Sequence, residues 1–598
     1  MNALDWTILV LTLLGIVLYG LYKSRASRNL EGYFLSNRSM PWYLVLLSIM
    51  GTQASAITFL SGPGQAFADG MRFVQYYFGL PLAMIVICIT FVPLFNRLRV
   101  FTAYEFLEER FDTRTRLFTS FLFLLQRGLS TGISIYAPTI ILCALFGWDV
   151  FWTNILMGGL LIIYTVAGGA RAVAHTQKLQ LFIIFAGMAL VGYWVVHLLP
   201  SNVGMGEALH IGGKLGRLNI ITDGDTAGGF DWTDKYNIWS GVIGGFFLAL
   251  SYFGTDQSQV GRYLTAQNNT ESRLGLLMNG LVKIPMQFGI LLIGVLIFSF
   301  YQFRGTPLTF NSALVANVEA TPYRDSLRQL QDATDTLNTQ RRHSAERFAA
   351  WVQQPASDSF AYYSRELKAQ QQQSETHRKT FREWTKQSGA GDGNDTNYVF
   401  LAFVKENLPA GLRGLLIAVI FLAAWGSIAA ALNSLAASTV VDLHKRLSGG
   451  ASITRSESAA DTGAQERSDY RISQGYTLAW GLFSIVVAQF AHRLGQSLIE
   501  TVNILGSLFY GVILGIFLVA FYLKRVAGPA TFVASLIVEL FVILLFFNEQ
   551  IPPLAWLPDI SFLWLNAIGA LGVVGLALLL QPLLGAGKRS VDTGTGHP

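Results

Sequence analysis

The residues best suited to hold a small cation lie in two stretches that offer oxygen atoms without charge. In the first stretch Gly51 and Ala54 stand three positions apart, so their carbonyls become candidates wherever the helix unwinds. In the second stretch Ala423, Gly426 and Ser427 share one helix face. A hard cation such as Na⁺ prefers carbonyl and hydroxyl oxygens. The same small residues also suit close packing between membrane helices, and spacing alone favours that alternative.

Ionisable residues inside apolar segments are the second source of chemistry, because they are rare at membrane depth and mark ligand pathways. Arg127 lies about eleven residues, or about 16 Å, into one apolar segment, and Lys283 lies at a similar depth in another. Hydroxyl side chains follow Arg127 along one helix face, at Ser130, Thr131 and Ser134. Two cations facing a cavity would favour an anionic solute. The alternative is that each cation pairs with a backbone carbonyl or a local acid.

Other patterns exclude several function classes. The GxxxxGK[ST] phosphate loop is absent, and no His or Cys pair stands at metal-ligand spacing. Both cysteines, Cys88 and Cys143, lie inside apolar blocks, which indicates neither a disulfide framework nor a metal site. Asp256 ends an apolar segment near the predicted cytoplasmic face, where a structural role suffices. We therefore expect a protein that is not an enzyme and does not use ATP.

Membrane-spanning helices must position these residues. Of the 598 residues 52% are hydrophobic and 13% are charged, whereas a soluble protein carries about 25% charged residues. The apolar residues come in blocks of about 20, the length that spans a bilayer. Thirteen blocks are predicted, at 5–23, 42–66, 74–97, 116–146, 149–168, 177–199, 237–256, 274–302, 411–440, 474–493, 498–523, 528–548 and 560–583.

The charges between the blocks predict their orientation. Every second connection is rich in Lys and Arg, beginning with 23–40 and 97–116. The positive-inside rule places these connections in the cytoplasm, the N-terminus outside and the tail 585–598 inside. We therefore expect a multi-pass protein of the plasma or inner membrane, with helices 1–8 in residues 1–302 and helices 9–13 in residues 401–584. The net charge of +6 is then no indication of a nucleic-acid partner.

The connection 303–400 is long, polar and rich in Gln, Arg, Glu and Asp. Charge alternation places it on the extracellular or periplasmic side. Apolar residues at helical spacing predict two helices, 322–353 and 358–386, joined near Pro355. We interpret this insertion as a solvated helical hairpin. A module that docks a partner is the functional alternative.

The second block is expected to be a broken helix. It becomes small and polar after Gly51 and then contains Gly62-Pro63-Gly64, which an unbroken helix tolerates poorly. At membrane depth a backbone outside a helix must line a cavity or be buried in protein. Such broken helices mark the binding sites of transporters. The alternative is a kinked helix whose small residues only allow close packing.

An ordered series of short motifs resembles the sodium:solute symporter family over all thirteen blocks, with the insertion left out. The most specific is Ala431-Leu432-Asn433-Ser434, which leads into Asp442-Leu443-His444-Lys445-Arg446. Earlier motifs are Gly32-Tyr33-Phe34-Leu35, Thr102-Ala103-Tyr104-Glu105-Phe106, and Asp256-Gln257 leading to Arg262-Tyr263-Leu264. Each motif alone is weak, and the ordered set is specific.

This resemblance implies an all-α polytopic membrane protein of the leucine-transporter type. Its thirteen transmembrane helices would contain an inverted-repeat core of ten, built from helices two to six and seven to eleven. The second and seventh helices would be broken. A four-helix bundle would move against a scaffold around a midplane site, so that the site opens to each side in turn.

The resemblance also implies where the coupling ion binds. The sodium site of the family falls on Gly51, Ala54, Ala423, Gly426 and Ser427, with Na⁺ as the cofactor. Gly426 stands where the family usually has a hydroxyl, so Ser427 would be the only hydroxyl ligand. A second sodium site of some relatives would need side-chain oxygens at Gly426, Ala429, Ala430 and Gln177. Only the amide of Gln177 offers one, so a single coupling Na⁺ is expected.

The solute is less sharply defined. Tyr252 and Phe253 match the aromatic pair that closes the inner side of the family's pocket, and Lys283 matches a pocket lysine of sugar carriers. The pocket Gln, Glu and Asn of those carriers fall on Thr58, Tyr77 and Ala249, which argues against a galactose-like site. The run from Thr131 to Pro138 resembles the branch that carries monocarboxylates, iodide and acidic vitamins. The candidate solute-binding residues are Thr52, Gln53, Thr58, Tyr77, Arg127, Ser130, Thr131, Ser134, Tyr252, Phe253, Lys283 and Asn503.

We therefore expect a Na⁺-coupled secondary symporter that imports a small organic solute by alternating access. An anionic solute of the monocarboxylate or acidic-vitamin type is favoured, and a Na⁺-coupled sugar symporter is the alternative. A sodium- or solute-gated sensor or channel on the same scaffold is the alternative from a different class. The expected partners are Na⁺, the solute and the lipid bilayer, with a further partner at 303–400 left open.

Overall fold

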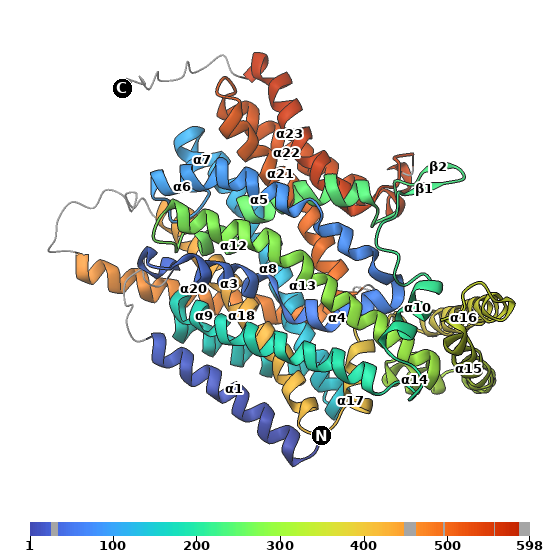
Figure 1. The fold of residues 1–598 in the computed structure, drawn as a ribbon. Helices are drawn as coiled ribbons and strands as arrows, with labels where there is room; N and C mark the ends of the chain where they lie inside the picture. Colours follow the sequence, from blue (N-terminus) through green and yellow to red (C-terminus); the bar gives the residue numbers. More distant parts are fainter. Residues whose placement is uncertain (25–33, 448–461, 494–496, 555, 585–598) are drawn as a thin grey trace.

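A computed structural model of the chain describes residues 1–24, 34–447, 462–493, 497–554 and 556–584. The described chain is helical apart from one short antiparallel pair, β1 (Asp225–Thr226) with β2 (Gly229–Phe230), in which Asp225 faces Phe230. The apolar helices pack side by side in one body, and a helical hairpin projects from one side of it (Figure 1). The predicted tail 585–598 lies outside the described residues.

All thirteen predicted blocks fall on helices. By length and composition, nine candidate bilayer spans occur among the described residues, and the count of thirteen crossings stays a prediction. The long helices are α1 (Ala3–Ser24), α8 (Thr113–Phe146), α9 (Val150–His197), α13 (Asn269–Arg304), α18 (Leu412–Ser438), α20 (Thr462–Phe490), α21 (Leu498–Tyr522), α22 (Gly528–Phe546) and α23 (Phe562–Leu584). The third block is divided into η2 (Gly70–Tyr77), α5 (Leu80–Ile89) and α6 (Phe91–Leu98).

The fifth and sixth blocks fall on one helical stretch, α9, which is 48 residues long. It is not one straight rod, because the hydroxyl oxygens of Tyr164 and Thr176 lie 2.8 Å apart, whereas twelve residues of a straight helix span about 18 Å. The basic connection expected between the two blocks is part of this helix. It contains no proline, and glycine lowers helix propensity without ending a helix.

The second block is broken, as predicted, beside the carbonyl candidates Gly51 and Ala54 and not at Gly62-Pro63-Gly64. α3 (Trp42–Gln53) ends at Ala54, and α4 (Ala56–Asp69) begins after Ser55. Pro63 lies inside α4. Its flanking glycines allow close packing instead, because a Cβ on Gly64 would lie 1.9 Å from the carbonyl oxygen of Thr396.

The seventh block is broken as well. A π-helical turn, η3 (Ser240–Gly244), leads into α11 (Gly245–Gly254), and α12 (Gln257–Tyr263) follows after Thr255 and Asp256. Between the two broken helices lies α18, whose residues are almost all buried. α18 packs against α9, α8, α1, α20 and α3. Its small side chains let five helices approach one central helix.

The insertion forms the hairpin that the sequence predicts. α15 (Arg324–Trp351) and α16 (Asp358–Gln387) pack against each other and project from the body (Figure 1). Arg217, which follows α10 (Met205–Lys214), binds Glu375 of α16 at 2.7 Å. The hairpin and the connection 215–239 therefore lie on the same side of the molecule, called here the outer side. The opposite, inner side carries α7 (Glu105–Arg110).

Candidate functional site

The break between α3 and α4 leaves two carbonyl groups without their usual helical donors. Ala54 leaves the helical path with φ −81° and ψ 72°. The N–H of Ser55 donates to the Gln53 carbonyl at 3.0 Å instead of reaching back to Gly51. The N–H of Thr58 donates to the Ser55 carbonyl at 3.0 Å instead of to Ala54. The carbonyls of Gly51 and Ala54 are therefore open to another partner, as the cation hypothesis requires.

On α18 the hydroxyl of Ser427 donates to the carbonyls of Ala423 and Ala424 at 2.9 and 3.1 Å. Its oxygen keeps acceptor capacity for a cation. A Cβ on Gly426 would lie 2.6 Å from Oε1 of Gln180. A hydroxyl-bearing residue at Gly426 would therefore require Gln180 to move, which gives a physical reason for the glycine.

Gln177 of α9 connects the two halves of this candidate site. Its Nε2 donates to the Gly426 carbonyl at 3.1 Å and to the Thr52 hydroxyl at 3.3 Å. Its Oε1 accepts from the Ser48 hydroxyl at 2.9 Å. Gln177 is fully buried. The sequence analysis noted this amide only as the one side-chain oxygen at the position of a second Na⁺ site, whereas it forms a bridge between α3 and α18.

A cavity of about 130 Å³ lies beside both breaks and Ser427. Eleven of the twelve predicted solute-binding residues line it. The exception is Lys283, which is buried on α13 behind Tyr77, with Nζ 5.4 Å from the ring centroid of Tyr77. Polar lining residues that the sequence did not single out are Ser55, Tyr76, Gln126 and Tyr510.

The charge of Arg127 is met by a local acid, one of the two alternatives that the sequence left open. Nη1 of Arg127 lies 3.8 Å from Oδ2 of Asp256. The same Oδ2 accepts the Tyr510 hydroxyl at 2.6 Å. Asp256 is 1% exposed, and its bonds to Tyr510 and to the Ser258 N–H fit the structural role expected from the sequence. The Nε of Arg127 is buried without a hydrogen-bond partner.

Aromatic side chains close the cavity at both ends. Toward the outer side, Tyr76 of η2 donates its hydroxyl proton to Oδ1 of Asn503 on α21 at 3.2 Å. Toward the inner side, Tyr252 lies against Phe253 with ring centroids 4.9 Å apart, and Gln259 donates to the Tyr252 hydroxyl at 2.6 Å. The site is therefore a polar chamber enclosed within a body of apolar helices.

A polar chamber between two broken helices, inside a body of membrane-spanning length, is the architecture of a membrane transporter. The model of the sodium:solute symporter family matches residues 33–317 and 386–538, and the chain belongs to that family. The unmatched residues 318–385 contain the hairpin, which is thus an addition to the shared fold.

Named relatives agree with this assignment. The sodium/sialic acid symporter SiaT of Proteus mirabilis (strain HI4320) is 23% identical over 98% of this chain and 96% of its own length. The human sodium/iodide cotransporter is 31% identical over 50% of this chain and 46% of its own length. The sodium-coupled monocarboxylate transporter 1 of Xenopus laevis is 29% identical, with 50% and 47% covered. The chain thus spans about half the length of the last two relatives.

A solved structure has the same fold. It shows a Na⁺-coupled sialic acid symporter in a substrate-bound outward-open state. The TM-score is 0.70 at 21% sequence identity, and the match covers 98% of both chains. The expected symporter fold with two broken helices is therefore confirmed.

Proposed function

We propose that the chain imports a small organic anion together with Na⁺ by alternating access. The observation that carries this proposal is the shared cavity. Gln53 and Ser55 at the α3–α4 break, Ser427 of α18 and Arg127 all line one chamber, and Asp256 pairs with Arg127 at 3.8 Å. Occupation of the cation site and the solute site can then influence each other through direct neighbours, and such coupling is reciprocal.

For the cation we propose a site at Gly51, Ala54, Ala423, Gly426 and Ser427, in which the carbonyls of Gly51, Ala54 and Ala423 and the hydroxyl of Ser427 are the ligands and Gly426 leaves a place for water. The open carbonyls at the break support this assignment, because a buried carbonyl without a donor needs another partner. A Na⁺ ion bound there would join α3 to α18. It would thereby favour the conformation in which the solute site is complete, and the Na⁺ gradient would drive uptake.

For the solute we propose a monocarboxylate or a similarly small anion. Pockets for drug-sized ligands measure roughly 300–1,000 Å³, so a cavity of about 130 Å³ suits a small molecule. Arg127 provides the positive charge, although Asp256 neutralises part of it. The hydroxyls of Ser130, Thr131 and Ser134 provide hydrogen bonds around the anion.

A second candidate solute is an acidic sugar. The similarity to sialic acid symporters over nearly the whole chain favours it. Amide groups on the cavity wall, at Gln53, Gln126 and Asn503, suit sugar hydroxyls. The small volume of the cavity favours the monocarboxylate.

We further propose that the N-terminus lies outside and the C-terminus in the cytoplasm, as the basic connections indicate. The outer side defined above is then extracellular or periplasmic, and the hairpin faces that compartment. A partner for the hairpin stays a hypothesis without a described contact to support it.

Uptake of labelled pyruvate into proteoliposomes under an imposed Na⁺ gradient tests the proposed function. Ser427→Ala is expected to raise the half-saturating Na⁺ concentration about tenfold, the loss of one ligand worth about 1.4 kcal/mol. Ser434→Ala is the matched control, because Ser434 makes the same two bonds, to Ala430 and Ala431 at 2.9 Å, without lining the cavity. Equal uptake in choline would overturn Na⁺ coupling. Na⁺ flux without any solute would instead support the channel alternative.

A further inference from the structure

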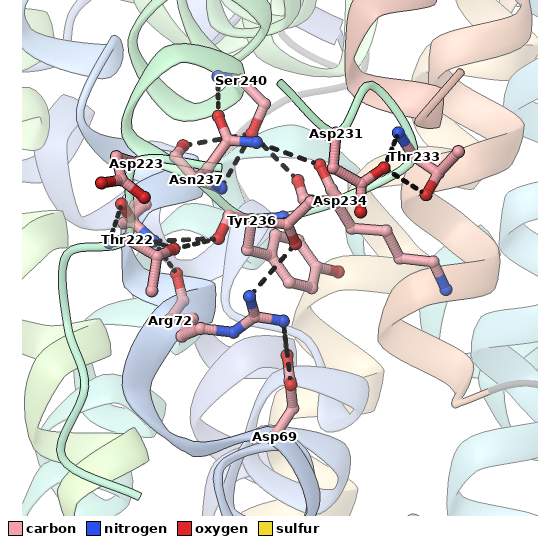
Figure 2. A network of polar contacts seen from close by, with 12 residues as sticks. Asp69, Arg72, Thr222, Asp223, Asp231, Thr233, Asp234, Tyr236, Asn237 and Ser240 are labelled. Carbon is pink, nitrogen blue, oxygen red and sulfur yellow. Dashed lines mark hydrogen bonds and ion pairs between the residues drawn. The ribbon is translucent and has the colours of Figure 1, made fainter. Parts of the chain in front are cut away.

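Two adjacent residues of the connection 215–239 bind two different elements at the outer end of the cavity. Asp234 accepts from Nη1 of Arg72 at 3.1 Å, and Nη2 of Arg72 binds Asp69 at 3.1 Å (Figure 2). Lys235 forms an ion pair with Glu500 in the first turn of α21. The connection therefore holds η2 with one side chain and α21 with the next.

Further hydrogen bonds fix the connection 215–239 to η2, so the connection and η2 are expected to move together. Nε2 of Gln75 donates to the Tyr236 carbonyl at 3.0 Å, and the N–H of Thr222 donates to Oε1 of Gln75 at 3.2 Å. Asn237 and Ser240 exchange two backbone-to-side-chain bonds, which close the turn before η3 (Figure 2). The connection and η2 are thus joined by several hydrogen bonds, and Lys235 of the connection binds Glu500 of α21.

Asn397, at the base of the insertion, forms a second link, which joins α4 to α21. Oδ1 of Asn397 accepts from the Ser61 hydroxyl of α4 at 2.7 Å and from the Leu498 N–H of α21 at 3.2 Å. Asn397 is 7% exposed. Asp395, two residues earlier, is held by Arg378 of α16 through bonds of 2.8 and 2.9 Å. The hairpin is therefore joined rigidly to the link.

Both links lie beside the outer wall of the cavity. Tyr76 and Tyr77 of η2 line this wall from one side, and Ile499 and Asn503 of α21 line it from the other. Glu500 stands in the chain directly beside Ile499. A solute that enters from the outer side must therefore pass between elements that the two links hold together.

We propose that the Lys235–Glu500 pair and Asn397 form an outer clasp that keeps the cavity closed to the outer side. The hairpin contacts this gate through Arg378, which holds Asp395 two residues before Asn397. The proposal rests on the proposed function only for the existence of a transport cycle. Lys235 is 45% exposed, and a pair of that kind shifts an equilibrium about fivefold at most. Such a clasp is weak enough to open in every cycle.

Thiol labelling tests the clasp without reference to Na⁺ or solute. The reporter is Ala249→Cys, which lines the cavity, in a Cys88→Ala/Cys143→Ala background. A membrane-impermeant methanethiosulfonate reagent is added on the outer side. Lys235→Glu and Glu500→Lys are each expected to speed labelling about fivefold, and the double charge swap is expected to slow it again. The clasp is overturned if either single variant labels no faster than the parent. It is also overturned if the double charge swap labels as fast as the single variants.

Asn397 has its own pair of variants. Asn397→Leu removes the acceptor and is expected to speed labelling severalfold, whereas Asn397→Asp keeps an acceptor for Ser61 and Leu498 and is expected to resemble the parent. Equal labelling of the two variants removes the insertion from the clasp. The uptake assay tests the proposed function separately. If the protein does not transport pyruvate but its labelling rates change as described, the proposed function fails and the clasp proposal stands.

Discussion

The two broken helices of the core leave the helical path in similar ways. They differ in the hydrogen-bond partners of the backbone groups at the break. At the α3–α4 break the carbonyls of Gly51 and Ala54 lose their helical donors. At the α11–α12 break the Tyr104 hydroxyl donates to the Thr255 carbonyl at 2.9 Å, and the Asp256 carboxylate caps the Ser258 N–H at 2.7 Å. The Gly51 and Ala54 carbonyls of the first break have lost their helical donors, whereas side chains of the protein bind the Thr255 carbonyl and the Ser258 N–H of the second.

The loop before α7, at residues 101–103, also binds the second break through Gln257. Nε2 of Gln257 donates to the Phe101 carbonyl at 2.8 Å, and Oε1 of Gln257 accepts from the Ala103 N–H at 3.0 Å. No loop binds the first break in this manner among the described residues; Gln177 contacts its Thr52 side chain instead. A ligand can bind an unwound membrane helix only through backbone groups that the protein leaves unpaired, and the first break offers such groups at Gly51 and Ala54.

The breaks also differ in charge. Residues 51–58 carry no ionisable group, whereas the second break carries Asp256, with Arg127 and Tyr510 around it. A cation fits the uncharged oxygens of the first break without a counter-charge. The charged second break instead suits the polar end of a solute. The predictions below test this division of roles.

The largest effect is expected from Asp256→Ala. The change leaves Arg127 as a buried charge without its acid and removes the acceptor for Tyr510, and breaking a buried pair costs about 3–5 kcal/mol. Na⁺-driven uptake should fall at least about 100-fold, a loss of about 2.7 kcal/mol in transport competence. Asp335→Ala, at an exposed carboxylate of α15, is the control. Uptake within tenfold of wild type would show that the second break does not need its acid.

Gln177→Ala should act on the first break. The change removes three hydrogen bonds, with Gly426, Thr52 and Ser48, each worth about 1 kcal/mol. We expect the half-saturating Na⁺ concentration to rise about tenfold in uptake assays, because α3 and α18 lose their bridge. Gln180→Ala is the matched control on α9, since Nε2 of Gln180 has no hydrogen-bond partner. Equal effects of the two changes would mean that the bridge does not support the cation site.

The sequence predicted those parts of the fold that depend on local periodicity. The hairpin helices were expected at 322–353 and 358–386 and occur at Arg324–Trp351 and Asp358–Gln387. Local propensity does not explain the first break. Gly62-Pro63-Gly64 is the strongest local breaker but lies inside α4, and the helix breaks at Ala54 and Ser55, two residues of ordinary propensity at the predicted carbonyl candidates. Tertiary packing overrides local propensity here.

The candidate site shows the same limit. Helical spacing placed Arg127, Ser130, Thr131 and Ser134 on one face, and all four line the cavity. The partner of Arg127 is Asp256, far along the chain, and no periodic pattern links the two. A chain that brings distant segments together through its topology creates such pairs only on folding.

Tyr104→Phe should have a smaller effect, confined to the second break. It removes the hydrogen bond to the Thr255 carbonyl, which is worth about 1 kcal/mol. We expect a lower Tm in detergent and a half-saturating Na⁺ concentration unchanged within about twofold. Tyr362→Phe, at an exposed hydroxyl of the hairpin, should leave both quantities unchanged. A large rise in the Na⁺ requirement of Tyr104→Phe would contradict the separation of the two breaks.

The smallest effect concerns pH and the loop that supports the second break. Glu105 lies outside the membrane-spanning segments and accepts from the N–H groups of Phe101 and Thr102 at 3.3 Å. Burial, together with the charge of Asp442, raises the pKa of Glu105 to about 7, although Arg116 opposes the shift.

Because the folded chain then holds this proton more tightly than the unfolded chain, the stabilisation is complete below about pH 4.5 and is lost as the pH rises through 7. We expect Tm to fall between pH 5 and 8 by an amount equivalent to a few tenths of a kcal/mol per pH unit, reduced by partial exposure of the side chain. Glu105→Gln should flatten this slope, because the amide does not titrate. Glu109→Gln, on the exposed face of α7, should not. If the slope persists in Glu105→Gln, the pH dependence arises elsewhere, and the loop supports the second break without regulating it.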